Sequence, residues 1–96
     1  MNIIVKAIKV EIVMITLPEV QVTNVGKRFL LSRGRVENSL TATAPQRVIK
    51  YGVVIHGQEY PVRQVLAVAT GTPEIEWSTT NAYRLLQKLG FEILIH

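Results

Sequence analysis

The sequence of 96 residues contains no cysteine and no aspartate, and each absence excludes a class of chemistry. Without cysteine there are no disulfides, no thiolate nucleophiles and no thiolate metal ligands, and the chain fits a reducing cytoplasm. All seven acids are glutamates, whereas metal-dependent nucleases and phosphoryl-transfer enzymes usually hold their ions with clustered carboxylates that include aspartate. The two histidines, His56 and His96, are far apart in the sequence. We therefore expect neither an enzyme nor a protein that holds a metal or another cofactor.

A long uncharged hydrophobic run is also lacking. Residues 3–17 are strongly apolar, but Lys6, Lys9 and Glu11 interrupt them, and a membrane span needs about 20 mostly uncharged residues. The lysines and the lack of a small-residue cleavage site also argue against a signal peptide. The partial alternation of polar and apolar residues predicts a β-strand that Pro18 ends. An apolar strand of this length can project and pair, over residues 3–15, with a second copy or with a partner protein.

The length predicts a single domain over residues 1–96, and the apolar fraction of 48% is enough to form its core. The chain divides into an N-terminal strand (1–17), a basic, loop-rich segment (18–46) and a second half (47–96). Within the middle segment, residues 27–36 are expected to form a short basic helix or a loop, and the polar residues 38–46 a loop.

The second half carries clearer signals. Residues 47–55 and 58–60 predict a hairpin around the turn His56-Gly57, and residues 91–95 predict a closing strand. Apolar residues at helical spacing predict helices near 62–70 and 79–89, with glycines after each and Ser78 or Thr79 as a cap. The fold class is therefore α+β: a small antiparallel sheet that includes residues 3–17, with the two helices packed on one face.

Positive charge is concentrated in the first half of the chain. Residues 1–50 carry eight cations and three acids, whereas residues 51–96 carry three cations and four acids, and the net charge is +4. A local basic region attracts phosphates and speeds encounters with polyanions. The alternative is an ordinary solvated basic surface. The candidate nucleic-acid-binding residues of this region are Lys27, Arg28, Arg33, Arg35, Arg47 and Lys50.

Three residues of the second half join this list. Arg63, near the start of a predicted helix, can reach a phosphate or a base edge, or else pair with Glu59. Trp77 precedes a helix cap and can stack on a base, or else close the core as a hydrophobic staple. Asn81, close to Trp77, is a side chain that can read adenine.

The strings YGVVIHGQEYP (51–61), VRQVLAVATG (62–71), WSTTN (77–81) and LLQKLGFEI (85–93) resemble the small N-terminal domain of McrA-like, modification-dependent HNH endonucleases. The resemblance covers residues 48–96. Arg63 stands where that family tends to have lysine, and Trp77 where phenylalanine is common. The resemblance implies an accessory or specificity module that contacts DNA, while a separate HNH domain, which this chain lacks, supplies catalysis.

These observations predict a non-catalytic nucleic-acid-binding module related to restriction and defence proteins, with DNA, which can carry a modified base, as the leading partner. The eight residues between the predicted helices are too many for a helix-turn-helix, which allows three or four. The alternative function is a protein-interaction module, such as an inhibitor, antitoxin or adaptor, that acts through residues 3–15.

Overall fold

The computed structural model describes residues 19–96. The strand predicted over residues 3–17, and with it the pairing edge over residues 3–15, therefore lies outside the described residues. The described part begins with strands β1 (Val20–Asn24) and β2 (Lys27–Leu31), which pair antiparallel. Helix α2 (Arg33–Ser39) follows. Ser32 caps this helix, because its hydroxyl accepts a hydrogen bond of 3.2 Å from the backbone N–H of Arg35.

The prediction of a loop-rich segment over residues 18–46 is therefore wrong in part. Residues 27–31 form a strand rather than a basic helix or loop, and residues 38 and 39 belong to the end of α2. The hairpin exists because Val20, Val22 and Phe29 pack against the main core from one face of the two strands. Its residues thus gain burial from partners that are distant in the sequence.

Three further strands form a separate antiparallel sheet in the order β4-β3-β5. They are β3 (Tyr51–Ile55), β4 (Gln58–Pro61) and β5 (Ile93–Ile95). The prediction placed the start of β3 at residue 47, but the strand begins at Tyr51. Its pairing with β4 starts only at Gly52, opposite Pro61, and its pairing with β5 starts only at Tyr51, opposite Ile95. Strand β5 begins at Ile93 rather than at residue 91. Phe91 is buried at the end of the preceding helix, where its N–H donates to the carbonyl of Leu86 at 3.0 Å.

The two predicted helices are confirmed as α3 (Val62–Thr70) and α4 (Thr79–Lys88), with the short 3₁₀ helix η1 (Glu74–Glu76) between them. Their ends follow local rules of sequence. Gly71 ends α3 in the left-handed conformation. Ser78 caps α4, because its hydroxyl accepts from the N–H of Asn81 at 3.1 Å.

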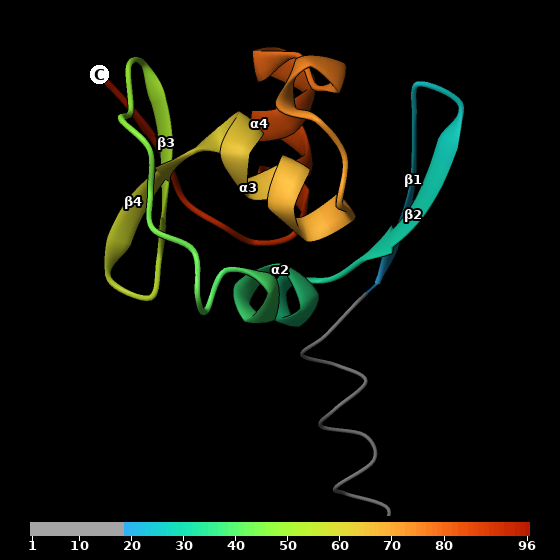
Figure 1. Cartoon of the computed structure of the whole chain (residues 1–96), viewed down its shortest axis with the longest axis horizontal. Helices are drawn as coiled ribbons and strands as arrows, with labels where there is room; N and C mark the ends of the chain where they lie inside the picture. The colour runs from blue at the N-terminus through green and yellow to red at the C-terminus, as the bar shows by residue number, and fades with distance from the viewer. Residues whose placement is uncertain (1–18) are drawn as a thin grey trace, which may run out of the picture.

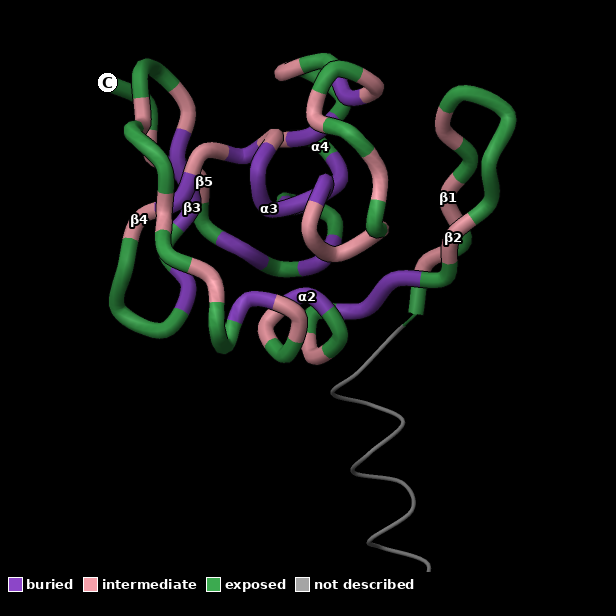
Figure 2. Tube along the Cα trace, viewed as in Figure 1, coloured by how far each residue is buried: buried purple, intermediate pink, exposed green. Residues whose placement is uncertain are grey.

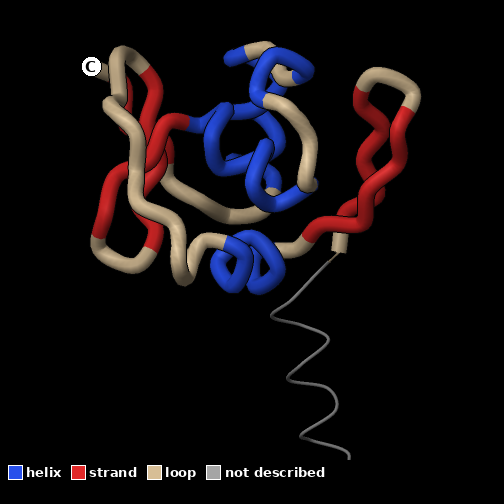
Figure 3. Tube along the Cα trace, in the orientation of Figure 1, coloured by secondary structure: helices blue, strands red, loops and turns tan. Residues whose placement is uncertain are grey.

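The helices lie between the two groups of strands (Figure 1). The three-stranded sheet stands on one side of α3 and α4, the β1–β2 hairpin stands on the other, and α2 runs below them. Figure 3 shows the same separation, with strand segments only at the two sides of the helical layer. The α+β class is confirmed, but the described strands make two sheets instead of the single sheet that was predicted.

The core is centred on α3, and the buried segments in Figure 2 converge on this helix. Its fully buried residues Val62, Val65 and Leu66 meet Val53 of β3, Val36 of α2 and Leu86 of α4 in one cluster.

Among residues 19–96, no helix is long and apolar enough to cross a bilayer.

Candidate anion-binding pocket

Three of the predicted cations of the first half are paired with glutamates of the same chain. Lys27 lies 3.2 Å from Glu76, Arg33 lies 3.3 Å from Glu37, and Arg35 lies 3.0 Å from Glu19. The single cationic cluster predicted between residues 27 and 50 is therefore not what the structure has. These pairs are largely exposed, and such pairs contribute about 0–1 kcal/mol each. They lower the local excess of positive charge without locking the side chains.

Arg33 also has a structural role. One of its terminal nitrogens donates to the carbonyl of Gly90 at 2.8 Å, and its guanidinium lies 4.8 Å from the centre of the Phe91 ring. These contacts tie α2 to the segment that follows α4. Arg28, in contrast, projects from β2 as an exposed residue and has no acidic partner in the part of the chain that the structure describes.

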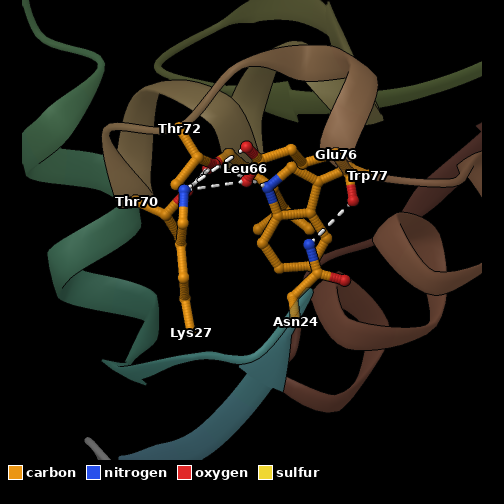
Figure 4. Close-up of polar contacts among 7 residues, drawn as sticks. All are labelled: Asn24, Lys27, Leu66, Thr70, Thr72, Glu76 and Trp77. Carbon is orange, nitrogen blue, oxygen red and sulfur yellow. Dashed lines mark hydrogen bonds and ion pairs between the residues drawn. The ribbon is translucent and has the colours of Figure 1, made fainter.

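Trp77 is a core residue, and the prediction that it is exposed for base stacking is wrong. Only 2% of its surface is accessible. Its ring centre lies 6.4 Å from that of Phe29 on β2, and its Nε1 donates to the hydroxyl of Thr72 at 3.1 Å. Figure 4 shows the indole inside this network, where Thr72 also contacts Thr70 at 2.7 Å. The alternative interpretation, that this residue closes a small core, is the correct one.

The same close-up shows how the hairpin is fixed to the helical layer (Figure 4). The side chain of Asn24 donates to the carbonyl of Glu76 at 2.8 Å, next to the Lys27–Glu76 ion pair. Both ends of the β1–β2 turn are thus held by one residue of η1. Lys27 therefore helps to attach the hairpin to η1 and also contributes to the surface charge.

The cations Arg47, Lys50 and Arg63 do come together. They line a pocket of about 450 Å³, in which Glu74 is the one acidic lining residue. We call this site the basic pocket. Pro61, Val62 and Arg63 at the start of α3 and Thr79 at the start of α4 are also in its wall. Two helix N-termini, each with a partial positive charge, therefore add to the three cationic side chains.

The irregular segment that carries Arg47 and Lys50 is fixed by buried polar groups. Gln64 of α3 donates to the carbonyl of Ala44 at 3.0 Å and accepts from the N–H of Gln46 at 2.9 Å. The hydroxyl of Tyr60 donates to the carbonyl of Thr43 at 2.8 Å. At the other end of the segment, the N–H of His96 donates to the carbonyl of Lys50 at 2.8 Å. The two cations thus stand on a backbone that is held on both sides.

The side chain of Arg63 is held by a contact within the protein that the sequence did not predict. One terminal nitrogen donates to the carbonyl of Glu74 at 3.1 Å, whereas the buried Nε finds no hydrogen-bond partner within residues 19–96. The predicted alternative, a pair with Glu59, is wrong, because Glu59 contacts His96 instead. A buried donor without a partner is costly.

Asn81 lies in a different place from the basic pocket. It lines a second hollow of about 410 Å³ between β1 and α4, together with Arg84 and Lys88. The two cations of α4 were not predicted as site residues. The signal was present in the sequence, because Asn81, Arg84 and Lys88 recur at helical spacing and share one face of α4.

The basic pocket has the chemistry of a binding site. Its lining residues include no histidine and a single carboxylate. Over the described range, no three histidine or glutamate side chains lie close enough together to hold a metal ion. What the pocket offers is positive charge, the Thr79 side chain and an apolar wall that includes Ile49, which is 85% exposed. This set suits an anionic group attached to a partly apolar ligand.

Comparison with known proteins identifies a family. No curated protein and no solved structure matches the chain. The model of the SCO5918-like family matches residues 27–95, which run from the start of β2 to the end of β5 and include the whole lining of the basic pocket. The chain therefore belongs to the SCO5918-like family.

Proposed function

We propose that this protein is a non-catalytic nucleic-acid-binding module that holds backbone phosphate in the basic pocket. The observation that carries the proposal is the convergence of Arg47, Lys50 and Arg63 with the N-termini of α3 and α4 around one hollow. Arginine and lysine side chains release condensed counterions when they bind phosphates, and helix N-termini favour anions. Two independent sources of positive potential thus act on one site.

The surroundings of the pocket favour a polymer over a small anion. Arg47, Ile49 and Lys50 are exposed on the irregular segment that forms one wall of the pocket. A nucleic acid can place one phosphate inside against Arg63 and lay the neighbouring phosphates against the exposed Arg47 and Lys50, with bases or sugars against Ile49. Lys50 also lies 5.5 Å from the centre of the Tyr51 ring, which places its charge at the pocket rim.

DNA is the leading partner in this proposal, and it rests on the resemblance of residues 48–96 to the accessory domain of McrA-like endonucleases. A specificity module of a restriction or defence system needs to bind DNA without cutting it. The cytoplasm is the compartment we propose for it, because a chain without cysteine suits a reducing environment.

The test compares variants that each remove one positive charge. Arg47→Gln and Lys50→Gln each lose one phosphate contact. Each is therefore expected to make the negative slope of log affinity against log salt shallower by about 1 on duplex DNA. Arg28→Gln is the matched control, because it changes the net charge equally on an exposed residue outside the pocket. Its slope is expected to stay at the wild-type value in a fluorescence anisotropy titration.

Two results would reject the proposal. One is no binding of single- or double-stranded DNA or RNA at low salt. The other is an equal loss of slope for Arg28→Gln and Arg47→Gln, which would mean that diffuse net charge rather than the basic pocket attracts the polyanion. Modified and unmodified duplexes measured side by side test the specificity role.

A further inference from the structure

A second hollow separates strand β1 from helix α4 on the hairpin side of the molecule. Its wall on one side is the whole of β1, Val20–Asn24, and on the other side the face of α4 that carries Asn81, Arg84 and Lys88. We call it the β1–α4 groove. It holds about 410 Å³ and shares no lining residue with the basic pocket. The five residues of β1 give it a length of about 17 Å.

The strand side of the groove carries backbone groups that β2 does not bond. β1 has one neighbour among the described strands, β2, and the two-residue turn makes Asn24 and Lys27 the first paired residues. In an antiparallel ladder, residues with and without mutual hydrogen bonds alternate. The pair next to such a turn is bonded, so Asn24, Val22 and Val20 bond to β2. The N–H and C=O groups of Gln21 and Thr23 then point away from β2, to the edge of β1 on which no other strand of residues 19–96 lies; we call it the open edge.

The helix side of the groove is cationic over an apolar floor. Trp77 and Leu85 are buried at its base, and Arg84 and Lys88 stand above them on successive turns of α4. No acidic residue lines the groove. Neither cation has an acidic partner in the portion of the chain described by the structure. Within residues 19–96, no ion pair neutralises the positive charge of this wall.

We infer that the β1–α4 groove binds an acidic peptide segment of another protein in extended form, added to β1 as a further strand. The open edge supplies backbone hydrogen bonds, and alternate side chains of an added strand point to opposite faces. Acidic side chains on one face meet Arg84 and Lys88, and the apolar residues between them face the opposite side. This interaction is independent of nucleic-acid binding in the basic pocket.

The groove fits other occupants less well. A second copy of β1 would present Gln21 and Thr23 and no acid inside the strand, so it offers no charge to meet Arg84 and Lys88. A nucleic acid satisfies the two cations but has no repeating amides to pair with the strand edge. It also gains no stacking surface, because Trp77 is buried. Of these three occupants, an acidic peptide is the one that uses both walls.

The experiment uses the full chain and a fluorescein-labelled octapeptide of alternating glutamate and valine. A second peptide has the same sequence with N-methyl groups on alternate amides, which removes the donors needed for strand pairing and keeps the charge. We expect the first peptide to bind and the second to bind at least about ten-fold more weakly. Trp77, the single tryptophan of the chain, lines the groove and gives a label-free fluorescence signal of binding.

Charge reversal locates the site. Arg84→Glu is expected to weaken binding of the first peptide about ten-fold or more, whereas Arg28→Glu, on the exposed surface of β2, leaves it within about two-fold. Equal binding of the two peptides, equal effects of the two reversals, or no binding at all each overturns the inference. So does binding of a single-stranded oligonucleotide in the groove that displaces the peptide, since nucleic acid would then be the occupant.

Discussion

Trp77 lies where three segments meet, since it packs against Phe29 of β2, donates to Thr72 after α3 and directly precedes the cap of α4. Trp77→Ala removes a large buried side chain and leaves a cavity, so we expect it to lower the free energy of unfolding by about 3–5 kcal/mol. Urea denaturation followed by circular dichroism measures this change. If instead Trp77→Ala weakens DNA binding and leaves stability unchanged, the side chain acts on the surface and its placement in the core is wrong.

Gln64 connects α3 to the irregular segment that forms one wall of the basic pocket. Its amide makes two hydrogen bonds to the backbone at Ala44 and Gln46, and Gln64→Leu leaves both backbone groups without a partner. We expect a stability loss of about 1–3 kcal/mol and faster hydrogen exchange at the N–H of Gln46. DNA affinity is expected to fall although Gln64 carries no charge. Unchanged exchange at Gln46 would show that the segment is fixed by other contacts.

At the scale of single residues, the sequence showed which side chains carry charge, but it did not show which residues of the same chain they contact. It gave Arg47, Lys50 and Arg63 as candidate phosphate contacts, and the structure brings these three into one pocket. It did not indicate Gln64, which lies within an apolar helical pattern. Lys27 and Glu76 are 49 residues apart, and no local rule connects such a pair. The exposure of Trp77 depended in the same way on Phe29, whose strand was not predicted.

The β1–β2 hairpin contains an unfavourable turn. Val25 and Gly26 have φ values of 53° and 75°, and a two-residue turn with both φ values positive prefers Asn-Gly. A β-branched residue in this region is strained by about 1–3 kcal/mol. Val25 is 64% exposed, so its side chain recovers little of that strain by burial. Val25→Asn is therefore expected to stabilise the protein by about 1 kcal/mol in urea denaturation.

The second hairpin provides the control. His56 and Gly57 form an equivalent turn with φ values of 54° and 76°, but histidine tolerates positive φ better than valine does. His56→Asn is expected to give a clearly smaller gain than Val25→Asn. Equal gains, or a loss for Val25→Asn, would show that the Val25 side chain makes contacts that offset its strain.

The same two turns explain which elements the sequence predicted. His56-Gly57 is close to the favoured turn sequence, and the hairpin around it was expected. Val25-Gly26 is not close to that sequence, and the hairpin around it was missed.

Helices α3 and α4 were predicted almost to the residue, because Ser78, Gly71 and Gly90 mark their ends locally. Strands β3 and β5 were predicted too long, because their ends depend on how far their partners extend.

On the scale of the whole molecule, six of the cations fall into two sets. Lys27, Arg33 and Arg35 pair with glutamates on the surface, whereas Arg47, Lys50 and Arg63 line the basic pocket. Salt acts differently on the two sets. Exposed pairs are weak and already screened, so they contribute little that salt can remove. Phosphate contacts release counterions and weaken steeply as salt rises.

The effects of salt on the two sets of cations can be measured separately in the wild-type protein. Three phosphate contacts predict a slope near −2.7 on duplex DNA, so a rise from about 50 to about 200 mM salt should lower affinity about 40-fold. Over the same range the free energy of unfolding should change by less than about 1 kcal/mol, because only weak surface pairs respond. Anisotropy titrations and urea denaturation in matched buffers give both numbers. A parallel loss of affinity and stability would mean that salt acts on the fold, and a flat affinity would mean that the basic pocket does not bind a polyanion.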